Sequence, residues 1–269
     1  MTGFGLLALH LLMPFINFFL TGTFHPSIRD DFSIFVPQKL VLDASTKSRA
    51  SSKAQTNKYM DLSTIKHVAI AGNIGAGKTT LCEKLSRHFG WESHFESTDD
   101  NPYLADFYHD MQRWSFNLQI YFLNNRYQQI LNILQGERTV IQDRTIYEDA
   151  YIFAPNLHDM GLMTSRDFEN YFSLFKTMSS QIQSPDLLIY LRASVATLVS
   201  HIQARGRDYE GSMSLDYLKR LNQRYEQWIA GYKEGKLLII NSDEVDFQNN
   251  PEDLGKVVNL VQAELHGLF

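Results

Sequence analysis

The chain has 269 residues, of which 44% are hydrophobic and 13% aromatic, with a formal net charge of -5. This composition is typical of a globular protein and excludes a disordered chain, and the acidic balance argues against a general nucleic-acid binder, which normally carries a basic surface. A single cysteine excludes a disulfide framework and a cysteine-rich zinc module, and it is typical of a reducing compartment such as the cytoplasm.

The first 59 residues differ in composition from the rest. Residues 4–20 are almost wholly apolar, but His10, Pro14 and Asn17 interrupt them, and the stretch is shorter than the roughly 20 residues of a spanning helix. A secretory signal would place a basic residue before this stretch, whereas the first one is Arg29. Residues 43–58 are rich in Ser, Thr and Lys without an apolar period, which is typical of a linker.

Three interpretations of this leader stay open: a membrane-touching anchor, a targeting peptide, or a start codon assigned too far upstream. Met60 favours the third, because it lies seven residues before the first clear strand. We therefore expect one functional domain at residues 60–269 that does not associate with membranes. Residues 1–59 are interpreted as a disordered or wrongly assigned leader outside it.

From His67 onward, short apolar runs alternate with segments of helical period. This alternation predicts a doubly wound α/β domain with a five-stranded parallel sheet. The predicted strands are residues 67–71, 91–95, 139–142, 186–191 and 236–241. The predicted helices are residues 79–89, 103–134, 166–182, 195–204, 215–232 and 251–265.

A complete G-x-x-x-x-G-K-[ST] motif lies between the first predicted strand and the first predicted helix, which is the context that this motif requires. Its residues are Gly72, Asn73, Ile74, Gly75, Ala76, Gly77, Lys78 and Thr79, followed by Thr80. Glycines let successive N–H groups surround a phosphate, the lysine reaches the terminal phosphates of ATP, and the threonine hydroxyl binds Mg²⁺. The motif predicts a nucleotide-binding P-loop.

The remaining polar signals favour a small-molecule kinase over a GTPase, because the chain lacks the Asn-Lys-x-Asp motif that reads guanine. Glu96 follows one predicted strand, and Asp143, Arg144 and Thr145 follow another, so they should meet at the sheet edge where α/β proteins bind ligands. Asp143 is then a natural partner of Thr79 at Mg²⁺.

Two further groups of polar residues suit a kinase acceptor site and lid. Gln119 and Arg126 are two helical turns apart and share a face. Arg205 and Arg207 lie between two predicted helices, as a positively charged lid would.

Residues 67–210 resemble the deoxynucleoside kinase family, and Asn101-Pro102-Tyr103 with residues 113–119 (RWSFNLQ) resembles its bacterial branch. The resemblance implies a P-loop NTPase fold with a lid segment and transfer of the ATP γ-phosphoryl group to the 5′-hydroxyl of a deoxynucleoside. It implies that Glu96 is the general base, that Arg144 pairs with it, and that Lys78, Arg205 and Arg207 hold the phosphates.

The resemblance also implies which residues bind the nucleoside. The predicted contacts are Tyr108 and Glu210 to the 3′-hydroxyl, Gln119 to the base edge, Arg126 with Asp149 to the exocyclic groups of the base, Phe153 stacked on the base, and Trp114 as a wall of the pocket. Two positions depart from the family pattern: Asp143 replaces a glutamate, and His201 replaces a lid arginine. The first shortens the reach to Mg²⁺, and the second removes one fixed positive charge.

Purine deoxynucleosides are the expected acceptors, and the helices predicted at 103–134 and 166–182 are expected to supply a homodimer face. Two alternatives remain. A nucleoside monophosphate kinase would want an arginine at the position of Glu96, because a carboxylate there repels the acceptor phosphate. A catalytically silent relative would have lost Lys78, Glu96 or Arg144, and all three are present.

Overall fold

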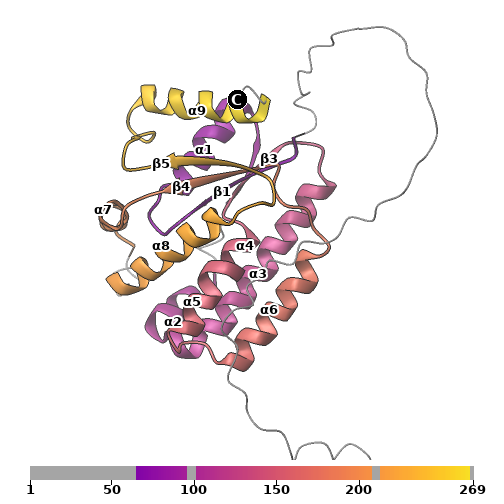
Figure 1. Cartoon of the computed structure of the whole chain (residues 1–269), viewed down its shortest axis with the longest axis vertical. Coiled ribbons are helices and arrows are strands. Elements are labelled where there is room, and N and C mark those ends of the chain that lie inside the picture. Colours follow the sequence, from indigo (N-terminus) through magenta and orange to yellow (C-terminus); the bar gives the residue numbers. More distant parts are fainter. Residues whose placement is uncertain (1–64, 96–100, 208–212, 267–269) are drawn as a thin grey trace, which may run out of the picture. The chain divides into compact units, whose positions relative to one another are not determined.

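The computed structural model describes residues 65–95, 101–207 and 213–266 (Figure 1). Within these ranges five parallel strands form a sheet in the order β2–β3–β1–β4–β5. The strands are β1 (His67–Gly72), β2 (Glu92–His94), β3 (Val140–Asp143), β4 (Leu187–Arg192) and β5 (Lys236–Asn241). The predicted parallel sheet is confirmed, with strand ends shifted by no more than two residues.

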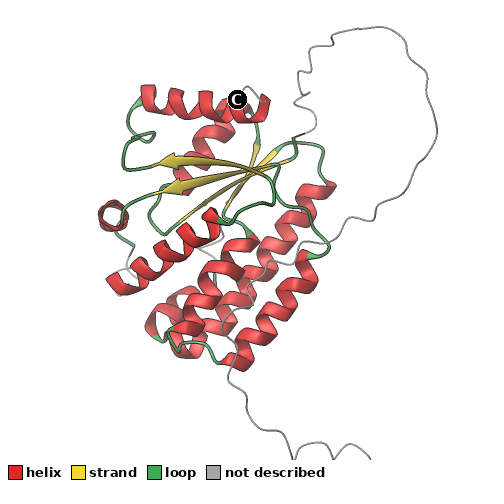
Figure 2. Cartoon of the chain, viewed as in Figure 1, coloured by secondary structure: helices red, strands yellow, loops and turns green. Residues whose placement is uncertain are grey.

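Helices cover both faces of this sheet (Figure 2). They are α1 (Lys78–Phe89), α2 (Leu104–His109), α3 (Met111–Gln135), α4 (Ile146–Glu148), the π-helical turn η2 (Asp149–Phe153), α5 (Ala154–Asp159), α6 (Ser165–Ser179), α7 (Val195–Arg205), α8 (Leu215–Ala230) and α9 (Pro251–His266). None of those within the described ranges combines the length and hydrophobicity needed to cross a bilayer.

The prediction of one continuous helix over residues 103–134 is wrong, because the chain breaks at Asp110 between α2 and α3. Asp110 has non-helical dihedral angles, and its carboxylate accepts a hydrogen bond from the backbone N–H of Arg113 at 3.0 Å. This contact caps the N-terminus of α3, as aspartate commonly does. The sequence also gave no prediction for α4, η2 and α5.

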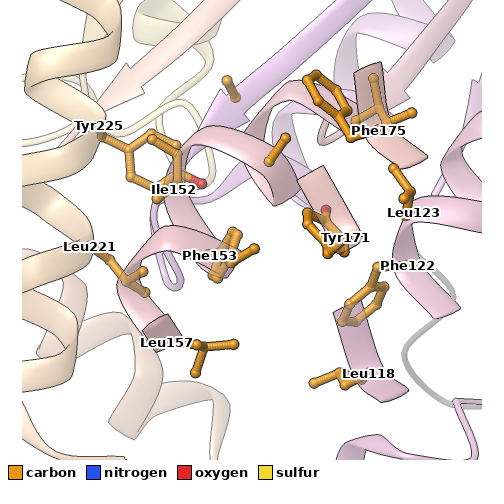
Figure 3. Packing of buried hydrophobic residues seen from close by; sticks show 14 of the residues in the cluster. Leu118, Phe122, Leu123, Ile152, Phe153, Leu157, Tyr171, Phe175, Leu221 and Tyr225 are labelled. Carbon is orange, nitrogen blue, oxygen red and sulfur yellow. The ribbon is translucent and has the colours of Figure 1, made fainter. Parts of the chain in front are cut away.

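Side chains of β1 alternate between two hydrophobic cores, as the twofold period of a strand requires. Val68 and Ile70 pack with residues of α1 and α9 on one face. Ala69 and Ala71 pack with residues of α3, α6 and α8 on the other. Figure 3 shows this second core, where Phe122 of α3, Phe153 of η2 and Tyr225 of α8 belong to the same cluster. The helices that carry the candidate acceptor residues are thereby fixed to the sheet.

His67, at the start of β1, is buried in its neutral form. Its Nε2 atom lies 2.9 Å from Oε1 of Gln142. Burial disfavours the charged imidazolium and lowers the pKa of His67 from 6.5 to about 4. The unfolded chain therefore takes up a proton near pH 6.5 that the folded protein takes up only near pH 4, so His67 lowers stability as the pH falls through this window.

A His67→Gln variant should lose this pH dependence. When the pH is lowered from about 7 to about 5, the unfolding free energy of the wild type should fall by about 2 kcal/mol more than that of the variant. Urea denaturation of both proteins at the two pH values measures it. An unchanged difference would contradict the burial of a neutral His67.

Candidate active site

The phosphate loop connects β1 to α1. Gly75 and Gly77 adopt left-handed φ angles of 84° and 93°, which glycine tolerates best. A β-carbon on Gly75 would also lie 2.8 Å from the backbone oxygen of Leu198. Gly77 is the N-cap of α1, so the first N–H groups of that helix are available to an anion. Lys78 is buried and donates a hydrogen bond from Nζ to the backbone oxygen of Asn73 at 3.0 Å.

Asn73 fastens this loop to α8. Its buried side-chain amide donates to the backbone oxygen of Leu218 at 3.2 Å and to Oδ1 of Asn222 at 3.1 Å. Its own Oδ1 accepts from the N–H of Ile74 at 2.8 Å. The position of the phosphate loop is thus fixed by α8, a helix that also packs against η2.

Thr79 and Asp143 lie together, as the sequence predicted. The register of β1 and β3 places Asp143 beside Ile70, and Thr79 Oγ1 donates to Asp143 Oδ2 at 2.6 Å. Asp143 Oδ1 is buried with no hydrogen-bond partner among the described residues. No group of three or more His, Cys, Asp and Glu in the described ranges is suited to a metal, but Mg²⁺ with a nucleotide commonly takes only one or two carboxylates plus phosphate oxygens. The pair therefore fits nucleotide-bound Mg²⁺.

One cavity of about 260 Å³ is lined both by the phosphate loop and by several of the predicted acceptor residues. Twelve of its lining residues are predicted site residues: Ile74, Gly75, Lys78, Thr79, Tyr108, Gln119, Asp143, Arg144, Asp149, Phe153, Arg205 and Arg207. No role in the site was predicted for the others: Phe95, Leu104, Phe107, Leu118, Phe122 and Tyr217. Apart from Phe95, these side chains are buried, and a buried apolar side chain carries no sequence signal that separates cavity wall from core.

Arg126 and Asp149, the pair predicted to read the base, form a buried ion pair. Arg126 Nε lies 2.6 Å from Asp149 Oδ2, and both side chains are 2% exposed. Asp149 and Phe153 are the first and last residues of η2, and both line the cavity. Single π-helical turns inside helices are frequent at functional sites, where they redirect side chains. Gln119 lies nearby on α3, and its Oε1 is buried without a hydrogen-bond partner among the described residues.

Arg144 follows β3 with a left-handed φ angle of 73°. Such a conformation costs a non-glycine residue about 1–2 kcal/mol and persists only where the surroundings enforce it. The guanidinium lies over the ring of Phe153 at 4.7 Å and donates to the Tyr225 hydroxyl at 2.7 Å. Its Nη1 is also 3.4 Å from Oε1 of Glu148.

Sequence reasoning missed Glu148, which is fully buried beside Arg144. Its carboxylate accepts from the backbone N–H of Thr145 at 2.6 Å and completes a capping box at the start of α4. A threonine followed three residues later by a glutamate is the sequence signature of that motif, so residues 145–148 did carry a signal for a helix start.

The other predicted site residues are distributed as follows. Trp114 packs against Tyr103 with ring centres 5.8 Å apart and does not line the cavity. His201 of α7 contacts the phosphate loop directly, with Nδ1 2.8 Å from the backbone oxygen of Gly75. The predictions for Glu96 and Glu210 lie outside the described residues.

The phosphate loop shares one cavity with Asp149 of the buried ion pair and with the strained Arg144, an arrangement typical of a P-loop phosphotransferase. Residues 68–266 match the family model described as "Deoxynucleoside kinase". The chain belongs to the deoxynucleoside kinase family and is an ATP-dependent kinase of that class.

Curated relatives and solved structures agree with this assignment. The deoxyadenosine/deoxycytidine kinase of Bacillus subtilis (strain 168) is 37% identical over 201 residues, which cover 74% of this chain and 93% of the relative. The deoxyguanosine kinase of Lactobacillus johnsonii is 38% identical over 208 residues, covering 74% and 92%. The structure of M. mycoides deoxyadenosine kinase with bound dATP is 28% identical, with a TM-score of 0.65 over 73% of this chain and 99% of that one. The predicted P-loop fold and the family resemblance are confirmed.

Proposed function

We propose that the chain transfers the γ-phosphoryl group of ATP, with Mg²⁺, to the 5′-hydroxyl of a purine deoxynucleoside, deoxyadenosine or deoxyguanosine. The observation that carries this proposal is the single cavity lined both by Lys78 and Thr79 of the phosphate loop and by Gln119 and Asp149. Donor and acceptor sites that share one cavity suit direct transfer between two bound molecules.

On the donor side, catalysis consists of positioning and charge neutralisation. Lys78 and the N-terminus of α1 hold the phosphates, and Thr79 with Asp143 would hold Mg²⁺, which neutralises charge on the phosphate oxygens. Arg205 and Arg207 line the cavity at the end of α7 and just beyond it. Closure of this lid over ATP would exclude water, which otherwise competes as the acceptor.

On the acceptor side, Glu96 is proposed as the general base that accepts the proton of the 5′-hydroxyl. Arg144 is proposed to orient this hydroxyl from its cavity-lining position after β3. Tyr108 also lines the cavity, which supports its proposed contact with the 3′-hydroxyl. Glu210 is proposed as the second contact to that hydroxyl.

The base preference follows from a buried acceptor, Gln119 Oε1, that lies near a fixed ion pair. Gln119 Oε1 is buried and needs a donor, and the Arg126–Asp149 pair is fixed by its ion pair and by burial. The exocyclic amino group of adenine or cytosine supplies a donor at this edge, whereas thymine presents a carbonyl and a methyl group. Leaving a buried polar group unpaired costs about 1–3 kcal/mol, so thymidine should be rejected. The preference for purines over cytosine rests on the resemblance to the bacterial branch.

Specificity constants for the four natural deoxynucleosides test this proposal. We expect deoxyadenosine or deoxyguanosine to rank first, deoxycytidine below them and thymidine last, with thymidine at least about 10-fold behind the best substrate. Asp149→Asn should narrow the gap to thymidine. The variant Asp159→Asn, whose half-exposed carboxylate pairs with Arg224 and His158 away from the cavity lining, should leave this gap unchanged. Thymidine in first place would contradict the ion-pair argument, and deoxycytidine in first place would contradict only the purine preference.

We further propose that residues 60–269 suffice for activity and form a homodimer. Leu174 of α6 is 41% exposed, and Tyr151 of η2, whose ring contacts Phe175 of α6, is 36% exposed, so a second copy would cover an apolar face. The protein shortened to begin at Met60 should keep its specific activity and elute with the mass of a dimer. Loss of activity would contradict the proposed boundary, and a monomeric mass would contradict the dimer.

The cytoplasm is the compartment that we propose for this enzyme. Cys82 is buried in α1 as a free thiol, which suits a reducing environment. Fractionation of the source cells, followed by detection of the protein, checks this assignment, and recovery with membranes would contradict it.

A further inference from the structure

Glu148 is a fully buried carboxylate that lies outside the cavity lining but collects donors from several parts of the site. One oxygen, Oε2, accepts from the backbone N–H of Thr145 at 2.6 Å. The other, Oε1, accepts from the N–H of Gly72 at 3.2 Å and the Tyr225 hydroxyl at 2.8 Å, and Arg144 Nη1 lies 3.4 Å away.

These donors come from separate segments whose relative placement decides the geometry of transfer. Gly72 begins the phosphate loop, Arg144 follows the neighbouring strand β3, and Tyr225 lies on α8. Arg144 holds a left-handed backbone, so its orientation depends on its surroundings. Tyr225 donates to Glu148 and accepts from Arg144, which closes a triangle of hydrogen bonds around the guanidinium.

We propose that Glu148 is a positioning residue for phosphoryl transfer, acting through Arg144 to hold the acceptor end in register with the phosphate loop. This inference rests on the proposed role of Arg144 at the 5′-hydroxyl. Glu148 does not contact the substrate. It supplies the negative charge and the acceptor geometry that keep the guanidinium over Phe153.

Glutamine cannot reproduce this arrangement, although it has the same shape. The carboxylate presents acceptors on both oxygens, whereas an amide presents one acceptor and one donor group. If the amide oxygen faces Gly72, Tyr225 and Arg144, the amide nitrogen opposes the N–H of Thr145. If the amide is flipped, the nitrogen opposes the other three donors. Either orientation also removes the charge beside Arg144.

The expected result of Glu148→Gln is a fall in kcat of about 10- to 100-fold, because a catalytic group displaced by about 1 Å can cost roughly 100-fold. KM for ATP should stay within about 2-fold of wild type, since the phosphate loop keeps its anchors at Asn73. In an Arg144→Ala background, the same substitution should change kcat by less than about 2-fold, because residues that act as a unit are not additive. A purely structural role would lower kcat equally in both backgrounds.

Two further variants keep the inference testable if the Glu148→Gln protein does not fold. Tyr225→Phe removes a single hydroxyl from the triangle and should lower kcat by about 3- to 10-fold, again only when Arg144 is present. Glu226→Gln, on the same helix, alters a half-exposed carboxylate bound to Tyr190 and Arg192 and should leave kcat within about 2-fold of wild type.

The outcomes separate this inference from the proposed function. A wild-type protein that phosphorylates no deoxynucleoside would overturn the function itself. If the wild type is active but Glu148→Gln lowers kcat equally with and without Arg144, only the positioning role is overturned. If Glu148→Gln does not fold, the same comparison is made with Tyr225→Phe. The positioning role is also overturned if Tyr225→Phe leaves kcat unchanged and the effect of Glu148→Gln on kcat is either absent or additive with that of Arg144→Ala.

Discussion

Replacing Glu96 with glutamine is expected to lower kcat by about 10²- to 10⁴-fold, the range that general-base catalysis contributes. Glutamine keeps the size of the side chain and can still accept a hydrogen bond, but it cannot take the proton of the 5′-hydroxyl. The effect arises at the acceptor, so the affinity for ATP should change little. Steady-state kinetics with deoxyadenosine, combined with a direct ATP-binding titration, separates the two quantities.

Glu92→Gln is the matched control for this experiment. Glu92 begins β2, and its carboxylate is exposed and lies 3.3 Å from His94. This variant should retain wild-type kcat. A Glu96→Gln enzyme that turns over at a comparable rate would remove Glu96 from the role of base.

Replacing Lys78 with alanine is expected to disable the donor side instead. Lys78 is buried in the cavity wall, and its Nζ lies next to the loop backbone at Asn73. A preorganised charge aimed at the transferring phosphoryl group is worth about 10²- to 10³-fold in kcat, and the same charge attracts bound ATP. The Lys78→Ala protein should therefore show both a fall in kcat of this size and weaker ATP binding.

Arg87→Ala controls for the loss of a positive charge elsewhere on α1. The side chain of Arg87 is 81% exposed and lies 3.9 Å from Glu83, so its removal should leave ATP handling unchanged. Wild-type kinetics in the Lys78→Ala protein would contradict the role of this loop in ATP binding.

The parallel sheet was predictable from the sequence because buried strands leave unbroken apolar runs. Residues 187–191 show this, and they lie in the inner strand β4. The boundary at Asp110 was not predictable from apolar periodicity, because α2 and α3 continue a similar pattern on both sides of the break. That break depends on one capping contact between Asp110 and the backbone of Arg113.

The phosphate loop was predictable because its chemistry is local: its glycines, lysine and threonine are contiguous. The pairing of Arg126 with Asp149 came from the family resemblance, and the structure supplies their distance. The role of Glu148 needed the structure, because its partners Gly72 and Tyr225 lie 76 and 77 residues away. A π-helical turn such as η2 has no sequence period that would predict it, and it is that turn which presents both Asp149 and Phe153 to the cavity.

The most direct measurement offers the protein γ-labelled ATP with an equimolar mixture of deoxyadenosine and its 5′-monophosphate, and then identifies the labelled product. Transfer to a nucleoside hydroxyl predicts that the label appears in deoxyadenosine 5′-monophosphate, with little in inorganic phosphate. Label found mainly in the diphosphate would show a nucleoside monophosphate kinase, and label found only in inorganic phosphate would show an ATPase. Either of these results would contradict the account.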